Sequence, residues 1–150
     1  TYRFRSVIAP GVVFGMDEGG NMAYDERTYP WDWHRKMLAD VRRARPFWYG
    51  DFYPLTTCSA APDAWIAMQL HRADQNAGVI LALRRAASPI AKADFRLSGL
   101  QPAAQYTFED ADTGKTWTVP GRTLAESGLP FAIDRPRTSR LVFYSAAKTP

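Results

Sequence analysis

Residues 96–117 read RLSGLQPAAQYTFEDADTGKTW, and their pattern indicates the class of fold. Within this stretch, the apolar residues Tyr106 and Phe108 alternate with polar neighbours, and this period of two is typical of a β-strand with one buried face. Turn-forming residues flank the strand, with SGLQPAA before it and DADTG after it. Gly114 suits the positive-φ position of a hairpin loop. The stretch therefore predicts a strand, a hairpin and a second strand.

The same alternation continues on both sides of this stretch. Further strands are predicted at WIAMQLHR (65–72), AGVILALRR (77–85), KADFRL (92–97), LPFAIDR (129–135) and SRLVFYSA (139–146). The second of these segments is apolar on both faces, as in a central strand. About seven or eight short strands separated by turn signals predict an antiparallel β-sandwich of Greek-key type, and thus a mainly β fold.

The first third of the chain has a different pattern. Residues 7–16 form an apolar stretch that Pro10 interrupts, and they predict one short buried strand. Residues 30–45 repeat apolar side chains every three or four positions, which predicts an α-helix with Thr28 or Tyr29 as its cap and Pro46 as its stop. One strand followed by one helix is half of an α/β unit.

Composition argues against several classes of partner. The net charge is +4, and much of the excess lies in HRKMLADVRRAR, residues 34–45. No nucleic-acid-binding motif accompanies this charge, so we interpret it as a solvated helix face and expect no nucleic acid. The longest apolar run, residues 77–83, is too short to span a bilayer, and no membrane partner is expected.

The residues needed for metal, cofactor or nucleophile chemistry are scarce. Cys58 is the single cysteine, so an internal disulfide is excluded, and we expect a quiet, partly buried thiol. The two histidines, His34 and His71, belong to different predicted elements, and His71 is expected at the surface or between sheets. GMDEGG lacks the spacing and the lysine of a phosphate-binding loop. We therefore expect no metal and no cofactor.

Six segments spread over nearly the whole chain are distinctive: RSVIAPGVVFGMD, RRARPFWYGDFYPLT, GVILALRR, RLSGLQPAAQY, GRTLAESGLPFAI and SRLVFY. Taken together, they resemble the C-terminal end of family 36 glycoside hydrolases, the α-galactosidase (melibiase) family. The resemblance implies a large N-terminal β-domain, a (β/α)₈ catalytic barrel and a small C-terminal sandwich. Residues 1–48 then correspond to the last strand and helix of the barrel, and residues 49–150 to the sandwich.

The resemblance also implies a retaining mechanism with two aspartates on earlier barrel strands. The motifs that carry those aspartates are not found in this sequence, so no catalytic residue is assigned in this chain. Asp17 follows the strand that resembles the last barrel strand, and it is a candidate for a substrate-facing role. Glu109, Asp110 and Asp112 crowd a hairpin, where turn chemistry explains them.

The sequence also leaves alternatives open. Aromatic side chains gather in YPWDW and PFWYGDFY, near the proposed domain junction. We expect them to join the helix to the sandwich, and a sugar-stacking platform is the alternative.

The function implied is a structural accessory to the catalytic barrel of the same parent chain. It would be inactive alone, and the parent would act on terminal α-galactosides. The alternative is a carbohydrate-binding β-sandwich module. Other barrel glycosidases with the same appendage, such as an α-N-acetylgalactosaminidase or a raffinose-synthase-like transglycosylase, also remain open.

Overall fold

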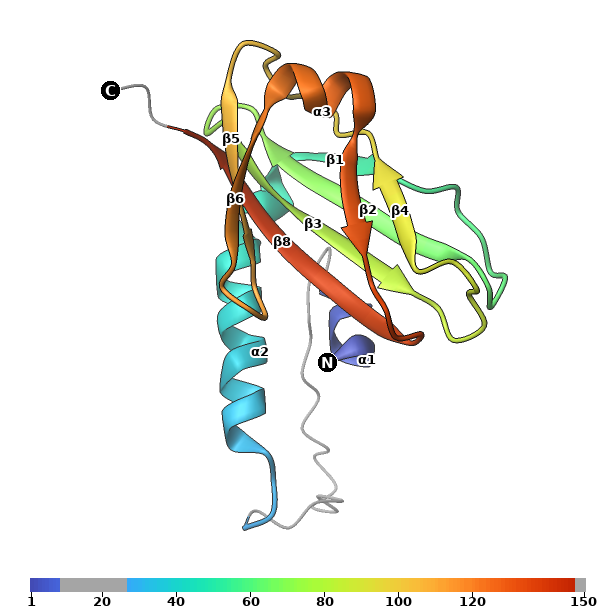
Figure 1. Cartoon of the computed structure of the whole chain (residues 1–150). Helices are drawn as coiled ribbons and strands as arrows, with labels where there is room; N and C mark the ends of the chain where they lie inside the picture. Colours follow the sequence, from blue (N-terminus) through green and yellow to red (C-terminus); the bar gives the residue numbers. More distant parts are fainter. Residues whose placement is uncertain (9–26, 148–150) are drawn as a thin grey trace.

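Short alternating segments pair into two antiparallel sheets in the computed structural model, which describes residues 1–8 and 27–147 (Figure 1). Three helical elements come first: α1 (Tyr2–Arg5), α2 (Trp31–Ala44) and the 3₁₀-helix η1 (Arg45–Tyr49). The strands and one further helix follow in the order β1 (Asp51–Pro54), β2 (Trp65–Arg72), β3 (Ala77–Arg84), β4 (Lys92–Phe95), β5 (Gln105–Asp110), β6 (Thr116–Pro120), α3 (Gly121–Ser127), β7 (Leu129–Ala132) and β8 (Thr138–Ala146).

The larger sheet has six strands in the order β1-β2-β3-β8-β5-β6, and the smaller sheet pairs β4 with β7. Strand β8 closes the described part of the chain but lies in the middle of the larger sheet, between β3 and β5. The chain crosses to the smaller sheet after β3 and again, through α3, after β6. These findings confirm the predicted mainly β fold, an antiparallel β-sandwich with seven or eight strands.

The main core fills the space between the two sheets. Phe95 and Phe131 reach it from the smaller sheet, and their rings lie 5.3 Å apart between centroids. Tyr106 and Phe108 reach it from β5 and are fully buried, as their alternation predicted. Leu124 of α3 closes one end of this core.

A second apolar cluster covers the opposite face of the larger sheet. There, Ala44 of α2 and Ile8 pack against leucines and valines of β2, β3 and β8. Because both faces of the sheet are covered, every residue of β3 is buried. Figure 1 shows α2 extending from this side of the sheet. The helix predicted for residues 30–45 is therefore confirmed, and its apolar stripe packs on the sandwich.

Several local predictions were wrong. The helix cap is Pro30, without a side-chain hydrogen bond, in place of Thr28 or Tyr29. Pro46 does end the α-helix as predicted, since α2 stops at Ala44; the chain continues as the 3₁₀-helix η1, in which proline is tolerated at the first turn. Helix α3 was not predicted. Of the strand expected at residues 7–16, Val7 and Ile8 lie in a turn after α1, and the rest falls outside the described residues.

No helix in residues 1–8 and 27–147 combines the length and the apolar character needed to cross a membrane. The division into residues 1–48 and 49–150 stays a prediction.

Candidate functional site

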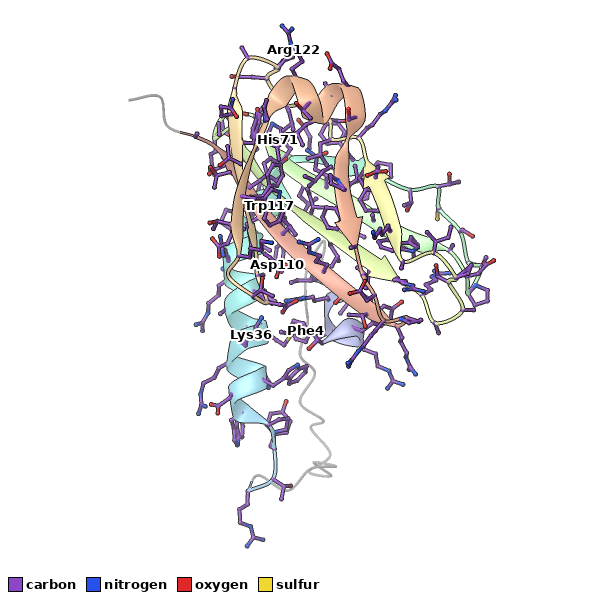
Figure 2. The ribbon with its side chains drawn as sticks, in the orientation of Figure 1. Phe4, Lys36, His71, Asp110, Trp117 and Arg122 are labelled. Carbon is purple, nitrogen blue, oxygen red and sulfur yellow. The ribbon has the colours of Figure 1, made fainter. Side chains whose placement is uncertain are left out.

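Acidic side chains of the β5–β6 hairpin meet basic side chains of the N-terminal elements along a charged seam. This seam consists of Arg5, Lys36, Asp40, Arg43, Glu109, Asp110, Asp112 and Arg140. Figure 2 shows Lys36 on α2 and Asp110 at the facing hairpin, with Phe4 of α1 nearby. Glu109, Asp110 and Asp112 are the carboxylates for which the sequence suggested turn chemistry.

Arg5 is the buried centre of the seam. Its Nη1 donates to Asp112 Oδ2 at 2.6 Å, and its Nη2 donates to Asp40 Oδ2 at 2.7 Å. Nη2 also reaches Asp112 Oδ1 at 2.8 Å, so that the Arg5–Asp112 pair is bidentate. Lys36 adds a hydrogen bond to the same Asp112 oxygen at 3.0 Å. Three segments distant in sequence are thereby fixed to one another.

Arg43 and Glu109 form a second bidentate pair farther along α2. Arg43 Nη2 donates to Glu109 Oε2 at 2.7 Å, and the guanidinium also lies 4.0 Å above the Phe143 ring centre. On the neighbouring strand, Arg140 Nε donates to Asp110 Oδ2 at 2.7 Å. Each of these interactions ties α2 or β8 to β5.

The pKa values of Glu109, Asp110 and Asp112 are lowered, which does not suit a group that must donate a proton to a leaving group. The hydrogen bonds from Arg43 lower the pKa of Glu109. Burial pushes the pKa of Asp110 and Asp112 upward, but hydrogen bonds outweigh it, from Arg140 for Asp110 and from Arg5 for Asp112, so that both pKa values are lowered. A glycosidase's general acid needs a raised pKa.

Turn chemistry explains Asp110, as the sequence suggested. Its Oδ1 accepts hydrogen bonds from the backbone N–H groups of Asp112 and Thr113, both at 3.0 Å. This pattern is the Asx-turn expected of aspartate in a tight loop.

A second polar cluster lies inside the sandwich, around His71. Gln69 Nε2 donates to the Tyr144 hydroxyl at 2.7 Å and to the Ser98 carbonyl at 2.8 Å, and Gln69 Oε1 accepts from the Ser98 N–H at 2.9 Å. The Tyr144 hydroxyl lies 2.9 Å from His71 Nδ1. Since that hydroxyl accepts from Gln69, we assign its proton to the bond with His71, which places the imidazole proton on Nε2.

His71 is 1% exposed, so it is the inter-sheet histidine that the sequence allowed. Burial lowers its pKa, although the nearby Asp51 carboxylate and the Gly99 backbone act in the opposite direction. Its Nε2 lies near Gly99 without a hydrogen bond of regular geometry. Burial keeps this cluster from external ligands, and it stabilises the fold.

The remaining candidates do not assemble into a catalytic site. Asp17 lies outside the described residues. Cys58 is exposed in the loop between β1 and β2, so the prediction of a partly buried thiol was wrong. Over the ranges 1–8 and 27–147, no group of three or more His, Cys, Asp or Glu side chains is placed to hold a metal ion.

The clustered aromatics divide between packing and exposure. Trp48 and Phe47 pack against the cluster beneath α2, as expected of residues that join helix and sandwich. Trp31 is 40% exposed, Phe52 58% and Tyr49 76%, and these three do not share that role.

The two tryptophans of the strands face the core. Trp65 is buried, and its Nε1 donates to the Ile90 carbonyl at 2.9 Å. Trp117 stacks on Phe108, with 5.6 Å between ring centroids. Both therefore pack in the sandwich core, with Trp65 buried and Trp117 half-buried.

The structure also contains a groove that was not predicted from the sequence. This groove, of about 250 Å³, lies where α2 and η1 meet the outer face of β5, β6 and β8. We call it the β5 groove, and it is lined by Arg43, Phe47, Ala77, Thr107, Glu109, Thr116, Phe143, Tyr144 and Ser145. Its residues come from six separate elements, so no local sequence pattern could indicate it.

Comparison with solved structures identifies similar folds in α-galactosidases. An α-galactosidase from Lactobacillus brevis matches with a TM-score of 0.61 and 18% identity, over 83% of this chain and 18% of its own. The galactosidase domain of the α-galactosidase–sucrose kinase AgaSK matches with a TM-score of 0.58 and 16% identity, over 75% of this chain and 15% of its own.

The family 36 α-galactosidase AgaB from Geobacillus stearothermophilus matches with a TM-score of 0.57 and 21% identity, over 77% of this chain and 16% of its own. The chain thus spans less than one fifth of each of these structures. No protein-family model and no curated protein sequence matches it. Most of this chain therefore has a fold that recurs as a small part of α-galactosidase structures, including one of glycoside hydrolase family 36.

Proposed function

We propose that this chain is the C-terminal region of a retaining, family 36 α-galactosidase-like glycoside hydrolase, and that its sandwich is a structural accessory to the catalytic barrel. The observation that carries the proposal is the asymmetry of the structural matches, which cover 75–83% of this chain but only 15–18% of the α-galactosidases. The sequence resemblance to the same family, over nearly the whole chain, supports it independently.

The chemistry of the charged seam supports an accessory role. Retaining hydrolysis uses two carboxyls about 5 Å apart, one of which must carry a proton to the leaving group. Glu109, Asp110 and Asp112 are held as anions by arginine, with lowered pKa values. In this proposal the nucleophile and the acid/base are two aspartates of the upstream barrel, and the parent enzyme hydrolyses terminal α-galactosides without a cofactor.

The accessory role would act through α2. In the proposed division, residues 1–48 end the barrel and residues 49–150 form the sandwich. The apolar cluster around Ala44 and the pairs made by Arg5 and Arg43 hold α2 on the larger sheet. A helix fixed on one side by the sandwich would steady the barrel to which it belongs.

An activity assay tests this proposal. We expect the purified 150-residue protein to release no nitrophenol from p-nitrophenyl α-galactoside, because the catalytic carboxyls lie elsewhere. Far-UV circular dichroism of the same sample provides the control for folding. Turnover above that of a buffer blank would contradict the proposal.

A truncation tests whether the parent enzyme needs the sandwich for its stability and activity. The parent enzyme is expressed with and without residues 49–150. We expect the truncated enzyme to lose soluble, active protein, because α2 then exposes its apolar stripe. A truncated parent with full activity and unchanged thermal stability would contradict the accessory role.

A further inference from the structure

The β5 groove begins where the cover of the larger sheet ends. Helix α2 and η1 cover β2, β3 and part of β8 through the second apolar cluster. Beyond them, the same face of β5 and β6 carries polar side chains, with Thr107 and Glu109 half-buried and Thr116 exposed. The groove runs along the edge of this helical cover, where Figure 1 shows α2 beside β5 and β6.

One side of the groove is aromatic. The rings of Phe47 and Phe143 lie 6.4 Å apart between centroids, at an angle of 44°. The guanidinium carbon of Arg43 lies over the Phe143 ring, 4.0 Å from the ring centre. Because Phe143 is buried and Arg43 covers its ring, the half-buried Phe47 is the aromatic surface on which the C–H groups of a ligand can pack.

The other side of the groove can both donate and accept hydrogen bonds. The hydroxyls of Thr107, Thr116 and Ser145 can each donate and accept. Arg43 uses one N–H on each oxygen of Glu109, so the carboxylate keeps lone pairs for further donors. Arg43 is held by both Glu109 and Phe143, and a ligand would therefore bind a side chain that is already ordered.

Charge and size narrow the class of ligand. Arg43 and Glu109 compensate each other, so the groove offers no net charge to a phosphate, a carboxylate or a nucleic acid. Its volume of about 250 Å³ lies just below the range of about 300–1,000 Å³ typical of drug-sized pockets. One small polyhydroxylated ring fits both constraints.

We propose that the β5 groove binds one neutral pyranose ring of a saccharide, with the ring's C–H face toward Phe47 and its hydroxyls toward Thr107, Thr116 and Glu109. This binding site goes beyond the accessory role and does not depend on it. A ring held by so few groups should bind with a Kd on the order of millimolar.

The test is a titration of the 150-residue protein, followed by ¹H–¹⁵N NMR. Methyl α-galactopyranoside and methyl α-glucopyranoside are the neutral probes, while galacturonate and inorganic phosphate are the charged ones. We expect at least one neutral probe to cause saturable shifts at the amides of residues 107, 109, 116, 143 and 145, and the charged probes to bind more weakly.

A pair of variants provides the matched control. Thr107→Val removes one hydroxyl from the groove, and Thr118→Val removes its cross-strand partner, which lies outside the groove and 3.4 Å from it. Both variants lose the same contact between the two hydroxyls and keep a β-branched residue on a strand. We expect Thr107→Val to raise the Kd about fivefold and Thr118→Val to change it less than about twofold.

Three results would overturn the proposal. These are no saturable shifts with any neutral probe up to about 50 mM, shifts that cluster away from the groove, or equal weakening by the two variants. Tighter binding of galacturonate or phosphate would equally contradict a site for neutral rings. Any of these results leaves the accessory role standing, because the truncation and turnover assays test that role separately.

Discussion

Arg5 shows how one side chain can hold distant segments together. Its side chain is 0% exposed, while those of Asp40 and Asp112 are 9% and 38% exposed. A buried ion pair gains little over an apolar contact, because both charges must leave water. Removal of one partner is costly, since the other charge stays behind without compensation.

We therefore expect Arg5→Ala to lower the free energy of unfolding by about 3 kcal/mol, measured by urea denaturation with circular dichroism. Arg35→Ala is the matched control, because Arg35 and Asp32 form an ion pair in which both side chains are well exposed. That change should be hardly measurable. Equal effects of the two variants would show that burial does not determine the strength of the seam.

Gly99 is the residue that allows His71 to be buried. It has a φ of +73°, and a Cβ added there would lie 2.7 Å from His71 Cδ2. Gly114 has a similar φ of +67°, but a Cβ there would meet no atom within 4 Å. The two glycines thus share the backbone strain of a substitution and differ in crowding.

For Gly99→Ala we expect a loss of stability of about 2–3 kcal/mol, and for Gly114→Ala about 1 kcal/mol. Thermal denaturation of both variants measures the difference. A loss at Gly114 as large as at Gly99 would rule out crowding at His71 as the cause.

The pH dependence of the free energy of unfolding should reflect the protonation of His71. Its pKa is lowered in the folded protein, while an unfolded chain has a value of about 6.5. The unfolded state therefore binds the proton more readily. Stability should fall as the pH drops through the window between about 6.5 and the lowered folded value, and this group adds no further loss below that window.

Urea denaturation at a series of pH values measures this effect. His71→Gln should remove most of the decline below neutral pH. The lowered pKa values of Glu109, Asp110 and Asp112 act at more acidic pH, since their stabilisation is lost as the pH falls from about 4.5 through the lowered folded values. An unchanged decline in His71→Gln would contradict the assignment.

At the scale of elements, α2 depends on a narrow apolar contact. Ala44 is 2% exposed and packs among side chains of β2, β3 and β8. We expect Ala44→Asp to place an unpaired carboxylate in that cluster, to cost about 3 kcal/mol and to accelerate hydrogen exchange along α2.

Ala39→Asp places the same residue on the exposed side of the same helix. It therefore controls for the helix propensity of aspartate. Equal acceleration of exchange in both variants would mean that α2 is not held by the contact at Ala44.

Local patterns explain which elements could be predicted. The strands from β2 to β8 carry clear alternation or continuous apolar runs, so their positions could be read within a few residues. Helix α3 could not, because it is seven residues long and begins within the pair Pro120-Gly121, which is typical of a turn. Its first residue, Gly121, is required by a tertiary contact, since a Cβ there would lie 2.2 Å from the Gln101 carbonyl oxygen.

At the scale of the whole molecule, the larger sheet is the centre of a three-layer arrangement. The β4–β7 sheet covers one face, and α1, α2 and η1 cover much of the other (Figure 1). This arrangement makes the helix part of the packing of the sandwich. In the proposed accessory function, α2 would be the helix shared with the catalytic barrel.

The strands, the main helix and the β-sandwich class could be predicted from the sequence, because alternation and helical periodicity are properties of neighbouring residues. The single cysteine also excludes a disulfide within these 150 residues. The central place of β8, the charged seam and the β5 groove depend on tertiary packing. Arg5 and Asp112 are 107 positions apart. No local pattern records such a pairing, since it follows from which apolar faces bury one another when the whole chain folds.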